Sequence, residues 1–359
     1  MARKTRKTRQ NSIVIVCEGS ETENQYFIEM SKYVQEKCPD SFDRILVLPT
    51  KKERAGKNPN RQHLVKSMQN PSAALWQYYL AKESSQAEYD KYRKQPTRYV
   101  REAQLLMRDE GYTEGWAVYD NDNFPDHDFA RSLAAGGQGL HIAYSSFSVE
   151  EWILCHFERN ATAYQRSECE SKTCGIGVKP DCQGRECIAG RIRKQHYISD
   201  WSKSKPKVFE TYTLPRLEQA LVNAAWVRSL DPNTPIPQRN PYTDVDALVL
   251  RFLGRTDDIR WIKPGETFEL FGGPITVFFD YRGVVVRYLG QSHIVIGMNT
   301  VQYCDYNGAP VQSASTASKI LFANNNEEII PVTQNARLLS FRNIEHGVIK
   351  IRYIEMPYK

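Results

Sequence analysis

The sequence predicts a chain of two parts: an α/β domain built on a parallel sheet, then a mainly antiparallel β-sandwich or barrel. Three observations lead to this prediction. Short Val- and Ile-rich runs alternate with helical patterns through about the first 230 residues, and this alternation is typical of parallel strands joined by helices. A stretch with four prolines, 231–243, then interrupts the chain and reads as a linker. From 244 onwards, short β-like runs are separated by Gly, Asn and Asp.

The elements of the first part follow from apolar periodicity. Short apolar runs with no polar alternation predict buried parallel strands at 12–16, 44–48, 115–119 and 140–144. Helical spacing of apolar residues predicts helices at about 20–37, 61–82, 98–110, 126–135, 149–157 and 206–230. The first of these helices begins in an acidic, oxygen-bearing stretch that is typical of a helix start.

The β-like runs of the second part are four to seven residues long and predict antiparallel strands. They lie at 268–271, 275–279, 284–288, 293–298, 319–322, 329–332, 338–341 and 348–354.

Composition places the chain among globular proteins. It has 359 residues, of which 41% are hydrophobic and 25% are charged. No apolar run approaches the ~20 residues that a membrane span needs, so we expect no membrane contact. The basic start of the chain has no apolar stretch behind it, so we expect no signal peptide and a cytoplasmic protein.

The net charge of +6 is concentrated in a basic N-terminal arm, 1–11. Residues 241–359 carry 12 basic and 12 acidic side chains and so contribute no net charge. Such an arm can bind nucleic-acid phosphates with release of counterions, or remain a solvated tail. The basic side chains of the arm are Arg3, Lys4, Arg6, Lys7 and Arg9.

Carboxylates follow two of the predicted strands. Glu18 comes directly after the first strand, and Asp120 and Asp122 follow the strand at 115–119. On an extended segment, residues at i and i+2 point the same way, so we expect both Asp side chains to reach one ion. In an open α/β sheet, chemistry takes place beyond the carboxyl ends of the strands. Gathered acids there favour a hard divalent cation, Mg²⁺ or Mn²⁺, which would stabilise the charge that develops when a phosphodiester is cleaved. The alternative is that each acid is only a loop residue or helix cap.

Three segments resemble the RloB-like family, a branch of the Toprim group that also holds topoisomerases, primases and OLD-type nucleases. The sequence EGSETENQYF at 18–27 resembles the family's opening motif, and YDNDNF at 119–124 resembles its DxD strand end. SSFSVEEWILCHF at 145–157 resembles a third motif but departs from it at Ser146, Phe147 and Val149. The stretch 197–227 also resembles a lysine-bearing segment of the family and the helix after it, with Lys203 as the lysine and Trp201 where tyrosine is common. The resemblance covers about 12–230.

This resemblance implies a Toprim-like, Rossmann-like parallel sheet over 12–230. It also implies metal-dependent cleavage of nucleic acid (RNA, in particular tRNA, or DNA) in bacterial or archaeal antiphage defence. Glu18, Asp120 and Asp122 would hold Mg²⁺, with Glu18 also a candidate general acid or base. Glu150 would complete the site. Lys203 would face phosphate, unless it is a solvated surface lysine.

Neighbouring residues in these motifs have plainer interpretations. Glu21 and Glu23 read as acids in the first helical turn, although one of them could reach the metal through water. His156 shares a helix with Trp152 and Ile153, which predicts a histidine packed in the core.

Four of the eight cysteines crowd into nineteen residues, within a predicted insertion at 165–195. Two pairs with C-x4-C spacing suit tetrahedral Zn²⁺ in a structural site. The alternative is a loop with free thiols. Basic residues flank the cluster and could contact nucleic acid. The cysteines are Cys169, Cys174, Cys182 and Cys187, and the candidate nucleic-acid contacts among the basic residues are Arg191, Arg193 and Lys194.

Two further hypotheses stay open beside the nuclease: a Toprim enzyme that transfers nucleotides, and a zinc-stapled scaffold that binds nucleic acid without activity. The β-rich region 244–359 carries no chemical motif. We expect it to sense a trigger, recruit a defence-system partner or mediate oligomerisation.

Overall fold

The computed structural model describes residues 11–50, 86–171, 173–176 and 182–254, and the backbone of the strands between 257 and 355. The basic arm and the predicted helix at 61–82 lie outside the described residues. The chain divides into two compact units. The first comprises Met1–Ala220 and Leu230–Leu253, and the second comprises Leu221–Ser229 and Gly254–Lys359.

The first unit is built on a four-stranded sheet in the order β2-β1-β3-β4, and every neighbouring pair is parallel. Cys17 pairs with Val118, and Asp120 pairs with Ser145, so the carboxyl ends of the strands lie at one edge. The parallel sheet that the sequence predicts is confirmed. Its strands are β1 Ser12–Cys17, β2 Arg44–Leu48, β3 Glu114–Asp120 and β4 Leu140–Ser145.

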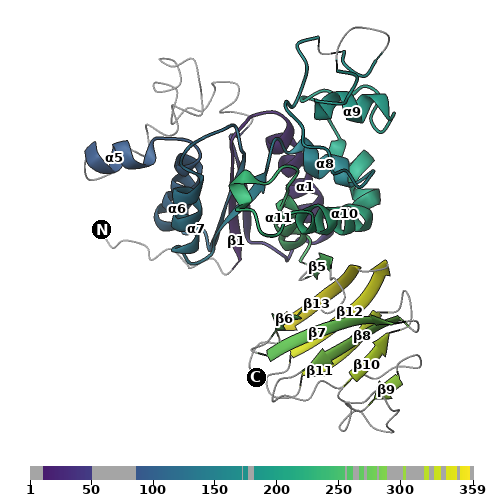
Figure 1. The fold of residues 1–359 in the computed structure, drawn as a ribbon. Coiled ribbons are helices and arrows are strands. Elements are labelled where there is room, and N and C mark those ends of the chain that lie inside the picture. The colour runs from purple at the N-terminus through teal and green to yellow at the C-terminus, as the bar shows by residue number, and fades with distance from the viewer. Residues whose placement is uncertain are drawn as a thin grey trace, which may run out of the picture. The chain divides into compact units, whose positions relative to one another are not determined.

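Helices cover both faces of this sheet. Figure 1 shows α6 and α7 on one side and α1 and α11 on the other. The α-helices are α1 Thr22–Lys37, α5 Gln86–Tyr92, α6 Thr97–Glu110, α7 His127–Ala135, α8 Glu150–Cys155, α9 Ile188–Lys194, α10 Leu217–Ser229 and α11 Val245–Phe252. Short turns of π- or 3₁₀-helix lie at η1 Phe209–Thr213, η2 Leu214–Arg216 and η3 Ile236–Gln238.

The core explains why the central strand is apolar throughout. All six residues of β1 are buried. Val14 and Val16 belong to a core that includes residues of α6 and α7. Because side chains alternate along a strand, Ile13 and Ile15 point to the opposite face, and both are fully buried. A strand covered on both faces needs apolar residues at every position, as parallel strands usually do.

Two parts of the chain differ from the sequence-based expectation. The predicted helix at 206–230 is broken into η1, η2 and α10, with Pro215 at the start of η2. The proline-rich stretch 231–243, which the sequence predicts as a linker, contains η3 and is bonded to the first unit at its end. Thr243 bridges to Ser145, the last residue of β4, and the Asp244 carboxylate accepts a bond of 2.6 Å from the amide of Tyr144. The chain then forms α11, so the second unit resumes at Gly254 rather than at 244.

The second unit contains two antiparallel sheets, in the orders β6-β7-β8-β10-β9 and β11-β12-β13-β5. Most of the predicted β-like runs coincide with these strands, although β5 and β9 were not expected and the run at 293–298 lies outside the described residues. The strands are β5 Asp257–Trp261, β6 Thr267–Leu270, β7 Gly273–Asp280, β8 Gly283–Tyr288, β9 Gln302–Cys304, β10 Lys319–Phe322, β11 Glu327–Val332, β12 Arg337–Glu345 and β13 Val348–Glu355.

Among the described residues, no helix combines the length and the apolar character that crossing a membrane requires.

Candidate active site at the carboxyl edge of the sheet

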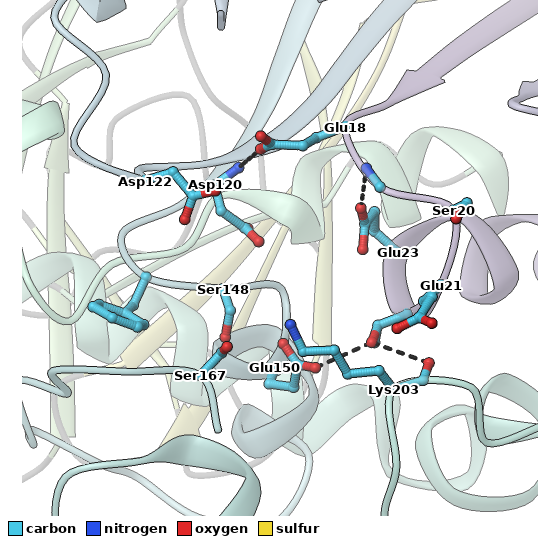
Figure 2. A pocket seen from close by; sticks show the side chains of 13 residues that line it. Glu18, Ser20, Glu21, Glu23, Asp120, Asp122, Ser148, Glu150, Ser167 and Lys203 are labelled. Carbon is cyan, nitrogen blue, oxygen red and sulfur yellow. Dashed lines mark hydrogen bonds between the residues drawn. The ribbon is translucent and has the colours of Figure 1, made fainter. Parts of the chain in front are cut away.

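An acidic pocket of about 230 Å³ lies at the carboxyl edge of the parallel sheet. Figure 2 shows carboxylates from the first strand–helix turn and from the end of β3 around one space, with Glu150 and Lys203 on its opposite side. The pocket is lined by Glu18, Gly19, Ser20, Glu21, Thr22, Glu23, Asp120, Asp122, Phe147, Ser148, Glu150, Ser167 and Lys203.

Glu18 and Asp120 come together because β1 and β3 are neighbours. The amide of Glu18 continues the ladder by donating to the carbonyl of Val118 at 2.8 Å. The Glu18 side chain then turns across the strand end, where Oε2 accepts from the amide of Asp120 at 3.0 Å. Its Oε1 lies 3.4 Å from the hydroxyl of Tyr99 on α6, which donates to it. The structure therefore brings together the acids that lie 102 positions apart in the sequence.

Asp122 reaches the pocket through a turn rather than by strand alternation. β3 ends at Asp120, and both Asp122 and Asn123 have positive φ angles, 41° and 55°. Asp and Asn adopt this left-handed conformation more readily than most residues. In Figure 2 the carboxylates of Asp120 and Asp122 point to the same side, into the pocket.

Glu150 and Lys203 are linked by Thr22 at the start of α1. Glu150 is 2% exposed and begins α8. The Thr22 hydroxyl lies 3.1 Å from Glu150 Oε1 and 3.2 Å from the carbonyl oxygen of Lys203, so its proton can serve either acceptor. Lys203 is partly buried and lines the pocket, and is not the solvated surface lysine of the alternative interpretation. The role of Thr22 was not anticipated, because a threonine at a helix start gives no sign of a partner 128 residues away.

Glu23 is an additional acid of the pocket. It lies in the first turn of α1, as expected, but its carboxylate accepts a hydrogen bond from the amide of Gly19 and so folds back towards Glu18. Glu21 is exposed at the rim.

The electrostatics of the pocket show an excess of negative charge. Burial, followed by nearby acids, raises the pKa of Glu18 to about 7. Burial and the neighbouring carboxylates also raise the pKa of Glu23 and bring that of Asp120 well above its usual range. Burial alone would lower the pKa of Lys203, but Glu150 and the other acids outweigh it and the pKa is raised. Carboxylates that resist ionisation because they are buried and lie beside one another form a donor set that suits a divalent cation.

A family comparison covers this whole region. The model of the RloB-like protein family matches residues 13–252, from the start of β1 to the end of α11. The chain belongs to the RloB-like family. No curated protein matches it. One solved structure, described as the crystal structure of CapF with the inhibitor 3-isopropenyl-tropolone, aligns over 96% of each chain with 9% identity. Its TM-score is 0.18, too low to support any argument.

The four predicted cysteines of this RloB-like chain form a compact cluster. Their sulfur atoms all lie within 4.8 Å of one another, and neighbouring sulfurs are 3.3–3.5 Å apart. A tetrahedral zinc site with Zn–S bonds of ~2.3 Å has sulfurs about 3.8 Å apart, so the cluster has the dimensions of a zinc site. The amide of Gly190 donates to the Cys187 sulfur at 3.3 Å, which supports a thiolate. Among the described residues, only these cysteines place their ligand atoms close enough together to hold an ion as they stand. The carboxylate oxygens of the pocket acids lie farther apart.

The basic residues beside the cluster are largely engaged within the protein. Arg191 forms two bonds with the Glu158 carboxylate, at 2.8 and 2.7 Å. The side chain of Arg193 is 3% exposed and contacts Glu168. The prediction that Arg191 and Arg193 contact nucleic acid therefore gains no support from their positions, because their donors face internal acceptors. Lys194 is exposed.

Two buried titratable residues stabilise the third motif without facing the pocket. His156 is 1% exposed and directs Nδ1 to the carbonyl of Trp152 at 2.9 Å, so the interpretation as a core histidine fits. Burial lowers its pKa to about 3. Glu151 is 5% exposed, and both its oxygens accept from the Ser146 hydroxyl. Its burial was not expected, since it directly follows Glu150 in a polar-looking segment.

Proposed function

We propose that this RloB-like protein is a Mg²⁺- or Mn²⁺-dependent nuclease of the Toprim type that acts in antiphage defence. The observation that carries the proposal is the pocket itself. Acids from the ends of β1 and β3, the first turn of α1 and the start of α8 surround one space, and one lysine reaches into it. Such a set is typical of sites that bind a divalent cation and a phosphodiester.

The residues divide into three roles. Asp120 and Asp122 would hold the cation, with Glu18 beside them. The metal would supply stabilisation of charge on the phosphate and activation of water. Glu18 would help to hold the cation or would act as a general acid or base, since its carboxylate lies at the end of β1 beside Asp120. Lys203 would neutralise a phosphate oxygen, and Glu150 would hold the ammonium in place.

The substrate class follows from the cation-binding acids. The described residues that line the pocket include one basic side chain and several acids, a set that repels a polyanion until a divalent cation is bound. Nucleic acid is the substrate we propose, RNA (including tRNA) or DNA. The exposed Lys194 and the basic arm would add contacts to the phosphate backbone.

We also propose that the two antiparallel sheets of the second unit pack as a sandwich. That domain would serve in sensing, partner binding or oligomerisation. Its balanced charge argues against a main role in binding phosphates.

Incubation of the protein with mixed cellular RNA and DNA tests the proposal directly. With Mg²⁺ or Mn²⁺ we expect cleavage products, and with EDTA none. Asp120→Asn should reduce cleavage at least about a hundredfold, whereas Glu36→Gln, an exposed acid at the far end of α1, should leave it unchanged. Cleavage that survives in the Asp120→Asn protein would contradict the proposal. Incorporation of labelled nucleotides would favour nucleotidyl transfer instead, and binding that persists in EDTA without products would favour a scaffold.

A further inference from the structure

Arg193 occupies a position between the four-cysteine cluster and the acidic pocket. It lies on α9, the helix that begins directly after Cys187. Its buried guanidinium is held by three acceptors: the carbonyl of Trp201 at 2.8 Å, the carbonyl of Cys174 at 3.4 Å and the carboxylate of Glu168 at 2.5 Å. One of these acceptors therefore belongs to the cluster.

The other two acceptors belong to the segments that supply pocket residues. Trp201 is two positions before Lys203, and Glu168 directly follows Ser167, and both Lys203 and Ser167 line the pocket. The same helix also holds Ser167 through its backbone, because the amide of Ala189 donates to the Ser167 carbonyl at 3.0 Å. The wall of the pocket that carries Lys203 is thus attached to the helix that the cysteines begin.

The cluster cannot hold this shape through apolar packing alone. Its core consists of cysteine side chains only. A Cβ added to Gly190 would lie 2.7 Å from the sulfurs of both Cys174 and Cys187, so the helix approaches the cluster as closely as a glycine allows. Four cysteine thiolates would repel one another at these distances, and a bound ion between them would remove that repulsion. Ile188 and Ile192 of α9 are fully buried and hold the body of the helix, so the ion would fix chiefly its first turn, which begins directly after Cys187.

We infer that Arg193 is a positioning residue that transmits the metal-bound shape of the cysteine cluster to Lys203 in the pocket. This inference rests on the proposed function for its catalytic consequence, but the geometric coupling stands without it. The guanidinium is needed because its several N–H groups donate at once to the carbonyls of Trp201 and Cys174 and to the carboxylate of Glu168. A lysine ammonium at the same position keeps the charge but cannot span all three acceptors.

The test compares Arg193→Lys with Arg191→Lys in the full chain. Arg191 is a matched control because it is an arginine on the same helix with a different partner. Its guanidinium forms two hydrogen bonds to Glu158, whereas Arg193 binds Trp201 and Glu168. Three quantities are measured: zinc content, melting temperature, and the rate at which an amine-reactive reagent labels Lys203 relative to the exposed Lys207. Labelling is read by mass spectrometry and requires no activity.

We expect Arg193→Lys to keep about one zinc ion per chain and to fold, with a lower melting temperature than wild type because buried acceptors lose their hydrogen bonds. Labelling of Lys203 relative to Lys207 should rise about tenfold, as hydrogen bonds to a charged group are lost, and cleavage should fall. Removal of zinc from the wild-type protein should raise the labelling in the same way, and Arg191→Lys should leave it unchanged. If Arg193→Lys does not fold, Glu168→Gln should show a smaller rise.

Unchanged labelling of Lys203 in Arg193→Lys would overturn the inference, and so would loss of zinc, since Arg193 would then support the cluster instead of transmitting its shape. If the wild-type protein cleaves no nucleic acid, the proposed function fails, while the labelling still decides whether the coupling exists.

Discussion

Glu18 is predicted to destabilise the metal-free protein when it is ionised. Its pKa is about 7 in the folded chain, against an ordinary value of 4.5. A raised pKa means that the folded state favours the neutral carboxyl. Below pH 4.5, Glu18 is neutral in both the folded and the unfolded chain and does not lower the free energy of unfolding. As the pH rises from 4.5 through 7, the free energy of unfolding falls. Glu18→Gln, which keeps an oxygen acceptor for the Asp120 amide, should recover it.

The magnitude follows from the two pKa values. A tenfold change in proton affinity corresponds to about 1.4 kcal/mol, so ionisation of Glu18 costs about 3 kcal/mol at pH 8 but less than about 1 kcal/mol at pH 5. For a domain of this size the gain at pH 8 amounts to a rise of roughly 6–12 °C in melting temperature.

Thermal unfolding of the full chain in buffer without added Mg²⁺ or Mn²⁺, and without chelator so that the cysteine cluster keeps its zinc, measures this effect at pH 5 and pH 8. We expect Glu18→Gln to unfold at a higher temperature than wild type at pH 8 and at nearly the same temperature at pH 5. Glu36→Gln should match wild type at both. Addition of Mg²⁺ at pH 8 should stabilise wild type more than Glu18→Gln and so narrow the gap. If Glu18→Gln is no more stable than wild type at pH 8, the electrostatic account of the pocket is wrong.

Three other substitutions test separate parts of the account. Gly190→Ala places a methyl group against two sulfurs of the cluster, so the purified protein should contain less than about half the wild-type zinc by elemental analysis. A full zinc content would contradict the close approach of α9 to the cluster. Gly19→Ala places a Cβ where the Glu23 carboxylate lies, so the carboxylate should move and Mn²⁺ binding should weaken about tenfold by calorimetry. An unchanged affinity for Mn²⁺ would show that Glu23 does not contribute to metal binding. Lys203→Gln should slow cleavage about a hundredfold with little change in melting temperature, and a variant as active as wild type would remove Lys203 from the chemistry.

The residues that the sequence located correctly are those whose position depends on strand order alone. Glu18 and Asp120 follow apolar runs that predict buried parallel strands, and a parallel sheet brings both residues to one edge. The motif resemblance added Glu150 and Lys203, which spacing could not have connected to that edge. Asp122 was assigned for an incomplete reason, because the turn at 122–123, and not strand alternation, directs it inwards.

What the sequence could not show depends on long-range packing. Arg193 lies in a basic run and looked exposed, yet three distant acceptors hold it inside the protein. Thr22 and Glu151 are hydrogen-bonded to partners that only the folded chain brings near. The prolines of 231–243 suggested a linker, but Asp244 anchors the end of that stretch to the backbone of Tyr144. In each case the contact joins segments that lie far apart in the sequence. The spacing of apolar residues predicts each segment separately and does not predict the contact between them.

The central claim is that acids from separate strands bind a common divalent cation, and a crystal structure with Mn²⁺ tests it most directly. The account predicts an anomalous peak in the pocket within about 2–2.5 Å of carboxylate oxygens from Asp120 and at least one of Glu18 and Asp122, and no such peak in crystals of Asp120→Asn. A pocket without bound Mn²⁺ at millimolar concentration, or a peak that persists in the Asp120→Asn crystals, would contradict it.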